Sequence, residues 1–146
     1  MIVLAEISDA KELTEIALES NSFWGYTDEI LESWTQDLTV SECIIKEMIV
    51  YKLNSVGFYI LNQPKEESIE LEFLFVLPNF IRKGIGSQLI SHAFEQAKLL
   101  NCKLVTLLVD SNAVPFYESK GFKIIDKKES SITDRFLIVM EKDLLA

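Results

Sequence analysis

The chain has 146 residues, 49% hydrophobic and 25% charged, which is the composition of one globular domain over residues 1–146 and not of a disordered or collagen-like chain. Its 23 acidic residues outnumber the 14 lysines and arginines, and a net charge of −9 argues against nucleic acid as a partner. The two cysteines lie outside any C-x-x-C pattern and there is one histidine, so we expect no zinc site and a cytoplasmic compartment. The sequence shows no signal-like leader and no long apolar run, so we expect no association with a membrane.

The first half of the sequence predicts a strand, two helices, a hairpin and a further strand. Residues 2–6 form a short β-type run, and Asp9 with Glu12 has the spacing of a helix cap. A second helix is expected to begin at Thr27, where acidic residues follow a capping side chain. Apolar and aromatic runs then predict strands over residues 48–53, 56–62 and 69–77, with Asn54 and Ser55 as the hairpin turn.

The second half predicts two helices and three strands. Residues 84–100 carry an apolar stripe at helical spacing, the strongest periodicity in the chain. Residues 103–109 are a nearly unbroken apolar run, for which we expect a strand covered on both faces. A short helix over residues 113–120 should stop at Gly121, followed by strands over residues 122–126 and 135–142.

The segment VLPNFIRKGIGS, residues 76–87, predicts an anion-binding turn between a strand and the long helix. The first N–H groups of a helix lack partners within it and carry its positive dipole end, so a diphosphate fits there. Two glycines permit close approach of a ligand, and Arg82 and Lys83 add charge. G-x-G alone is weak evidence, and the segment is neither a Walker loop nor G-x-G-x-x-G, because position 89 is leucine.

A second motif makes a resemblance specific. In DSNAVPFYESKGF, Asn112 precedes a short helix that contains Phe116 and Tyr117. Taken with the V-x-P and GIG segment before it, this motif resembles the GNAT superfamily of acetyl-CoA-dependent N-acetyltransferases over residues 71–122. The resemblance implies an α/β fold: a mixed, mostly antiparallel sheet with helices on both faces and a splayed central strand pair. It also implies acetyl-CoA as co-substrate.

The resemblance further implies roles for individual residues. Backbone groups at the end of the strand would hold the pantetheine and polarise the thioester carbonyl, and the turn would hold the CoA diphosphate. The residues concerned are Phe75, Val76 and Leu77 for the first role, and Arg82, Lys83, Gly84, Ile85, Gly86 and Ser87 for the second. Where the family motif usually begins with Gln or Arg, this chain has Ile81, so that side-chain contact is lost while the backbone donors are kept.

The resemblance also assigns an asparagine and two aromatic residues to the cofactor-binding side of the site. Asn112 matches an asparagine that contacts the cofactor, and Tyr117 matches the tyrosine that often protonates the departing thiolate. A phenol of pKa about 10 gives its proton to a thiolate of pKa about 8.5 only slightly uphill. Phe116 and Tyr117 are alternatively core aromatics; we favour packing for Phe116, which also borders the cofactor site, and the catalytic role for Tyr117.

The acceptor amine must lose a proton before it attacks, since an alkyl amine of pKa about 10.4 is protonated at pH 7. Glu70 and Glu72 lie two residues apart on the strand that enters the cofactor site, and we place them on the face that continues as Leu74 and Val76. Either one, with Glu72 preferred, is a candidate general base acting through water. The alternative is a solvated strand face, and a bulge would change the parity.

Other residues divide between acceptor binding and packing. Trp24 and Tyr26 either wall the acceptor pocket or pack at the helix junction, while Phe23 is expected in the core. For His92 a packing or surface role is expected, and for Cys102 a buried one.

The prediction is therefore an N-acetyltransferase that moves acetyl from acetyl-CoA to a primary amine by direct attack. A small-molecule or peptide amine is expected as acceptor, with some preference for cations, and a homodimer is possible. A non-catalytic CoA-binding sensor or partner subunit is the alternative, and transfer of a longer acyl group is a third. Peptide N-terminus, lysine, polyamine, amino acid and aminated antibiotic all remain open as acceptors.

Overall fold

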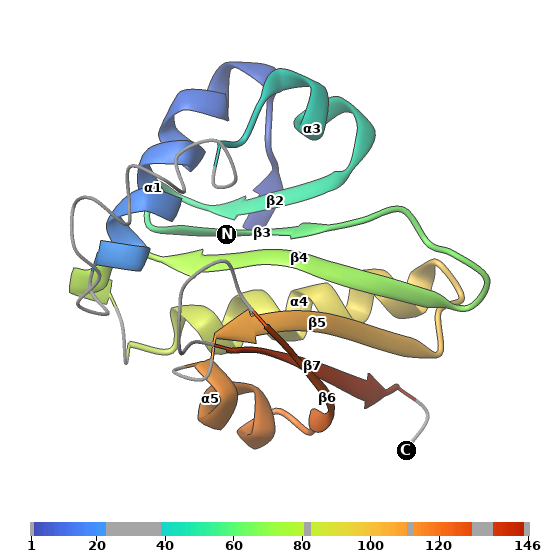
Figure 1. Ribbon diagram of the computed structural model, residues 1–146. Coiled ribbons are helices and arrows are strands. Elements are labelled where there is room, and N and C mark those ends of the chain that lie inside the picture. The colour runs from blue at the N-terminus through green and yellow to red at the C-terminus, as the bar shows by residue number, and fades with distance from the viewer. Residues whose placement is uncertain (1, 23–38, 81–82, 111–112, 130–135, 145–146) are drawn as a thin grey trace.

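The computed structural model describes residues 2–22, 39–80, 83–110, 113–129 and 136–144 (Figure 1). In chain order the elements are β1 (Ile2–Leu4), the 3₁₀ helix η1 (Ile7–Asp9), α1 (Ala10–Ser22), α3 (Glu42–Glu47), β2 (Ile49–Leu53), β3 (Gly57–Leu61), β4 (Ser68–Val76), the 3₁₀ helix η2 (Pro78–Phe80), α4 (Ile85–Leu99), β5 (Leu104–Asp110), α5 (Val114–Ser119), β6 (Lys123–Glu129) and β7 (Phe136–Asp143).

The strands form one sheet in the order β1-β2-β3-β4-β5-β7-β6. Every neighbouring pair is antiparallel except β4 and β5, which are parallel at the centre. In Figure 1, α1 and α3 lie beside the strands of the N-terminal half, and α4 runs behind the sheet. The predicted fold class, a mostly antiparallel mixed sheet with helices on both faces, is confirmed.

The sheet separates two groups of buried side chains. The larger group joins α4 and α5 to one face, with Leu89, Ile90, Ala93 and Ala97 as the buried stripe of α4. The smaller group packs α1 and α3 on the opposite face of β2, β3 and β4. At about 25 cal/mol per Å² of apolar surface, burial of these groups is the main stabilising contribution to the fold.

The central strands pair along only part of their length. Ser68–Leu71 of β4 pairs with Leu104–Leu107 of β5, whereas β4 runs on to Val76 and β5 to Asp110 without further pairing between them. The sheet is therefore open between the two strands over their carboxyl-terminal residues, as the predicted splay requires.

Most predicted elements are found within a residue or two of their expected bounds. The helix expected from Thr27 lies outside the described residues, and α3 was not predicted. Ser41 caps α3 by accepting a hydrogen bond from the N–H of Ile44, at 3.1 Å. Asp9 does not cap α1: it closes the preceding turn by accepting from the N–H of Glu6 and forms an ion pair with Lys52, each at 2.8 Å.

The expectation that β5 is covered on both faces was wrong. Val105 and Leu107 are buried beneath α4, but the side chains between them face the other way, and Leu108 is 39% exposed. The helices of the second face, α1 and α3, lie over β2 to β4 and leave this part of β5 open. None of the helices in the described ranges is long and apolar enough to cross a membrane.

Candidate active site

The first turn of α4 presents backbone donors. Gly84 is the N-cap residue, with φ of +82°, a left-handed conformation that glycine adopts without the cost a Cβ brings. Its carbonyl accepts the first helical bond, from the N–H of Gln88 at 3.0 Å. Within the part of the chain that the structure describes, the N–H groups of Ile85, Gly86 and Ser87 donate no hydrogen bond to the protein. The helix thus leaves three donors at its positive end.

Phe116 of α5 packs over this turn. A Cβ added at Gly86 would lie 3.3 Å from Cζ of Phe116, so the second glycine of the motif serves close packing between α4 and α5. Lys120, which follows α5, donates from Nζ to Oγ of Ser87 at 2.7 Å. Exposed Lys83 lies 5.7 Å from the ring centroid of Phe80. The ammonium group of Lys120 therefore lies beside the turn, and Lys83 directly precedes the N-cap residue in the chain.

The backbone N–H and C=O groups of successive β4 residues point alternately toward β3 and toward the unpaired side that faces β5. The N–H of Leu77 donates to the carbonyl of Val56 at 2.8 Å, which takes that donor out of the cofactor site. Successive residues of an antiparallel strand point their amide groups to opposite sides, so the N–H and C=O of Val76 point away from β3. They face the open side toward β5. Of the three predicted backbone residues, Val76 has the best-placed donor.

A β-bulge sets the direction of the two glutamates. Ile60 of β3 pairs with Phe73 of β4, but its neighbour Leu61 pairs with Leu71, so Glu72 is the extra residue. A bulge commonly redirects one side chain. Here it changes the parity of the strand: Leu71, Leu74 and Val76 belong to the α4 face, while Phe73 and Phe75 pack toward α1 and α3.

This parity corrects the predicted position of the glutamates. Ile69 and Leu71 both enter the α4 side of the core, so Glu70 between them lies on the opposite face. Glu70 and Glu72 are close enough for their side chains to share a hydrogen bond, so the two do lie together. The face that they share continues as Phe73 and Phe75, not as Leu74 and Val76.

Glu70 and Glu72 differ in their surroundings. Glu70 is exposed, yet desolvation at its carboxyl, together with the nearby carboxylate of Glu72, raises its pKa above the usual value. Glu72 accepts a hydrogen bond from Nδ2 of Asn62 at 3.0 Å. The raised pKa favours the protonated form of Glu70 relative to a free carboxyl, and an amide donor orients Glu72 as an acceptor.

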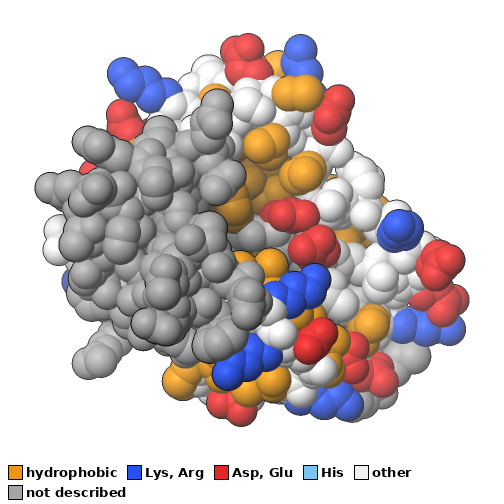
Figure 2. All heavy atoms as spheres, viewed as in Figure 1, with side chains coloured by type: hydrophobic (Ala, Val, Ile, Leu, Met, Phe, Trp, Pro, Cys, Tyr) orange, Lys and Arg blue, Asp and Glu red, His pale blue; other side chains and the backbone are white. Residues whose placement is uncertain are grey.

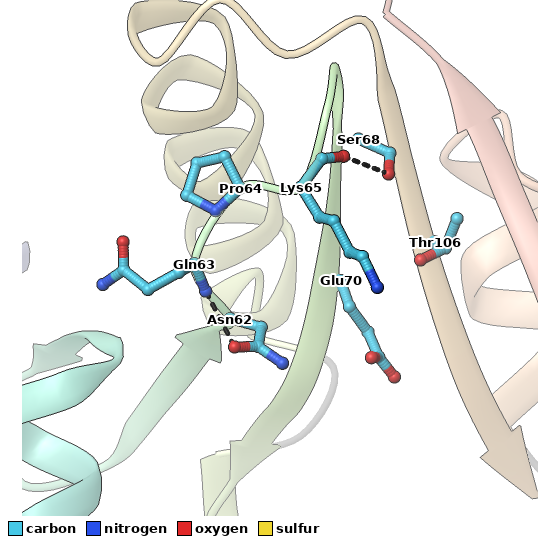
Figure 3. A pocket seen from close by; sticks show the side chains of 7 residues that line it. All are labelled: Asn62, Gln63, Pro64, Lys65, Ser68, Glu70 and Thr106. Carbon is cyan, nitrogen blue, oxygen red and sulfur yellow. Dashed lines mark hydrogen bonds between the residues drawn. The ribbon is translucent and has the colours of Figure 1, made fainter.

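Glu70 lines a cavity of about 380 Å³ at the hairpin end of β4 (Figure 3). The other lining residues come from the β3–β4 connection and from β5: Asn62, Gln63, Pro64, Lys65, Ser68 and Thr106. Glu70 is paired in register with Thr106 across the parallel ladder. On the same side of the molecule, acidic and hydrophobic side chains adjoin near the middle of the surface (Figure 2).

Tyr117 lies in the larger core, 5% exposed. Its ring meets Phe116 and Phe122 edge to face, with centroids 5.1 and 5.5 Å away. Burial raises the pKa of Tyr117 well above the ordinary value for a phenol. The residue is therefore protonated throughout the physiological range, on the α4 and α5 side of the sheet.

His92 and Cys102 serve packing, as expected. Nδ1 of His92 lies 2.6 Å from the hydroxyl of buried Tyr59, and its ring packs on Tyr51. Burial lowers the pKa of His92. Cys102 is 4% exposed. Among the described residues, no cluster of three histidine, cysteine or acidic side chains could hold a metal.

The structure brings together the turn of α4, the end of β4 and α5, but four predicted site residues lie outside the described residues: Trp24, Tyr26, Arg82 and Asn112. Two side chains at the site were not predicted. Asn62 follows the apolar run of β3 and has no local pattern that marks it, and Lys120 contacts a residue 33 positions earlier. Only the basic character of Lys120 beside the GF motif was visible in the sequence.

Comparisons with known proteins agree with this geometry. Residues 45–124 match the GNAT acetyltransferase domain. The chain therefore belongs to the GNAT acetyltransferase family, whose co-substrate is acetyl-CoA.

Individual relatives give the same assignment. The chain is similar to the PaiA N-acetyltransferase of Thermoplasma acidophilum, solved in complex with coenzyme A, with 26% identity, a TM-score of 0.77 and 98% of each chain covered. A GCN5-related N-acetyltransferase of Rhodopseudomonas palustris has 20% identity and a TM-score of 0.81, over 98% of this chain and 94% of that one, and supports the fold.

An uncharacterized N-acetyltransferase of Methanocaldococcus jannaschii is 38% identical over 68 residues, which are 44% of this chain and 30% of that protein. The match thus spans less than a third of that relative's length.

Proposed function

We propose that this protein transfers the acetyl group of acetyl-CoA to a primary amine by direct attack. The observation that carries the proposal is the opening between β4 and β5 after Leu71 and Leu107, with the amide of Val76 directed into it. A thioester carbonyl in that opening would meet a fixed backbone donor. Removing one such donor from an oxyanion site typically costs about 3–4 kcal/mol of transition-state stabilisation.

The turn of α4 is the proposed site for the CoA diphosphate. Its donors are the N–H groups of Ile85, Gly86 and Ser87, and Lys83 and Arg82 add charge from the preceding segment. Such donors suit an anion because they need no reorganisation and lie at the positive end of the helix dipole. The fit to the cofactor therefore rests on backbone geometry.

The two candidate acid–base groups lie on opposite faces of the sheet. Glu72 lies on the face of α1 and α3, and Tyr117 on the face of α4 and α5. Both faces border β4 and β5, whose pairing ends at Leu71 and Leu107. An amine arriving from the first face and a thiol leaving toward the second would pass the amide of Val76 between them.

Protons balance in this scheme. The amine nitrogen forms a bond to the acetyl carbon as the carbon–sulfur bond breaks; the amine proton passes through water to Glu72, and the thiolate receives a proton from Tyr117. Glu72 lies four residues before Val76, roughly 13 Å along the strand, so the proton would have to pass along a chain of waters. The raised pKa of Tyr117 makes its proton transfer more uphill than an ordinary phenol would.

The proposal also covers the cellular compartment, the charge of the acceptor and the acceptor-binding residues. We propose a cytoplasmic enzyme, since exposed Cys43 and buried Cys102 are both free thiols. A cationic acceptor, whether a small molecule or a peptide, suits the carboxylates of Glu70 and Glu72. Trp24 and Tyr26 stay as proposed acceptor contacts and Asn112 as a proposed cofactor contact.

A calorimetric titration with acetyl-CoA, followed by a thiol-release assay with a panel of amines, tests the function. Binding with amine-dependent release of free CoA, and an acceptor heavier by one acetyl group in mass spectrometry, is the expected result. Binding without release for any amine would favour the non-catalytic sensor. Absence of binding would overturn the acetyltransferase proposal.

A further inference from the structure

Lys120 is a cation that the fold directs to the first turn of α4. It is the C-cap residue of α5, where its N–H donates to the carbonyl of Tyr117 at 3.0 Å, and the chain turns back at Gly121. Its half-buried side chain passes the ring of Phe116, 5.6 Å from Nζ to the centroid, and ends on Oγ of Ser87. Backbone and ring contacts therefore fix the ammonium group.

The electrostatic surroundings of Lys120 are unfavourable in the absence of a ligand. Ser87 is the third residue of α4, so the ammonium group lies beside the positive end of a 15-residue helix. A cation is destabilising there. In the described ranges no carboxylate forms an ion pair with Lys120; the ion pairs of Lys52 with Asp9 and of Lys103 with Glu67 lie elsewhere in the structure. An anion bound at the turn would offset the repulsion between the ammonium group of Lys120 and the positive end of α4.

We propose that Lys120 is a phosphate-binding residue that contacts the diphosphate of CoA, an inference that rests on the proposed function. The serine hydroxyl is a neutral acceptor that takes one of the three N–H bonds of the ammonium group, and two remain for phosphate oxygens. The side chain supplies a charged contact in a motif that has Ile81 at its usual polar position. Lys120 is thus the side-chain complement to the backbone donors of α4.

Titration calorimetry with CoA and with 3′-dephospho-CoA tests this assignment in Lys120→Met. Both ligands carry the diphosphate, so we expect both dissociation constants to rise by the same factor, about 10-fold or more. Lys120→Arg should restore most of the affinity.

Lys98→Met is the matched control. It removes the same charge from the last turn of the same helix, about 16 Å from Ser87 along the axis, where Lys98 is exposed. We expect its affinity for CoA to stay within about twofold of the parent protein, since a 16 Å separation exceeds the Debye length at physiological salt.

The outcomes separate the inference from the function on which it rests. If the unaltered protein does not bind CoA, the proposed function fails. If it binds CoA and Lys120→Met binds equally well, the role of Lys120 is wrong. A loss for CoA but not for 3′-dephospho-CoA would move Lys120 to the 3′-phosphate and overturn the diphosphate contact. Thermal unfolding checks that Lys120→Met folds. If it does not fold, Lys120→Gln, which can still donate a hydrogen bond to Ser87, replaces it in the titrations.

Discussion

At the scale of single residues, the neighbouring carboxylates Glu70 and Glu72 have different surroundings and different proposed roles. Glu70 has a raised pKa and borders a cavity, whereas Glu72 is the bulge residue and is oriented by Asn62. A general base must be ionised and positioned. The pair therefore supports Glu72 as the base and Glu70 as the neighbouring carboxyl with the raised pKa.

Glu72→Gln should lower kcat/KM at pH 7 by about 100-fold, because removing a positioned general base typically costs at least that much. The loss should shrink as pH approaches about 10, where the amine deprotonates without help. Thiol release between pH 6.5 and 10 measures both effects. Glu70→Gln is the matched control, with a smaller loss; equal losses at every pH would contradict the assignment.

Tyr117→Phe should reduce kcat while the dissociation constant of acetyl-CoA changes by less than about twofold, because a phenol proton, not a packing surface, is removed. General-acid contributions of about 100-fold are typical. The ring contacts with Phe116 and Phe122 are kept, so the thermal midpoint should not fall appreciably. Unchanged kcat would mean that the thiolate leaves without a proton from Tyr117.

At the scale of elements, α4 depends on the conformation of its N-cap residue, Gly84. Gly84→Ala should destabilise the protein by about 1 kcal/mol, because alanine at a φ of +82° is strained. If the turn relaxes, its N–H groups no longer converge, and the affinity for CoA should fall as well. Denaturant unfolding and calorimetry measure the two effects. Full stability and full affinity together would show that the left-handed cap is dispensable.

The contact between α4 and the sheet predicts a pH dependence of stability. Burial lowers the pKa of His92 in the folded protein, so the unfolded chain binds a proton first as pH falls below about 6.5. Stability from this residue is therefore present above pH 6.5 and lost toward lower pH. Thermal midpoints between pH 8 and 5 should fall more steeply for the parent than for His92→Gln; parallel curves would contradict this role.

The sequence predicted those elements whose signals are local. The stripe of α4, the hairpin at Asn54 and Ser55, and the stop at Gly121 each depend on neighbouring residues, and each is found in the structure. The bulge at Glu72 was not predicted, since it depends on how β3 and β5 pair with β4. The contact of Lys120 with Ser87 was missed for the same reason, and α3 because six residues give little periodicity.

At the scale of the whole molecule, charge is unevenly distributed. Residues 1–76 carry 15 acidic and 4 basic side chains, including the glutamates of β4, whereas the lysines beside the turn of α4 lie in the second half. In the proposed function, the acceptor would therefore meet acidic side chains and the cofactor lysines, despite a net charge of −9. An anionic cofactor is attracted by local groups against a repulsive overall field.

This distribution predicts which acceptors react fastest. An amine that carries a second positive charge should have a higher kcat/KM than a monoamine of similar size, because the acidic half raises its local concentration. Screening shortens the range of that attraction to about 8 Å at 0.15 M salt, so the ratio of the two kcat/KM values should fall as sodium chloride rises from 0.02 to 0.5 M. Thiol-release rates for matched mono- and diamines, measured at saturating acetyl-CoA, give this ratio directly. A ratio near one at low salt, or one that does not respond to salt, would mean that shape and not charge selects the acceptor.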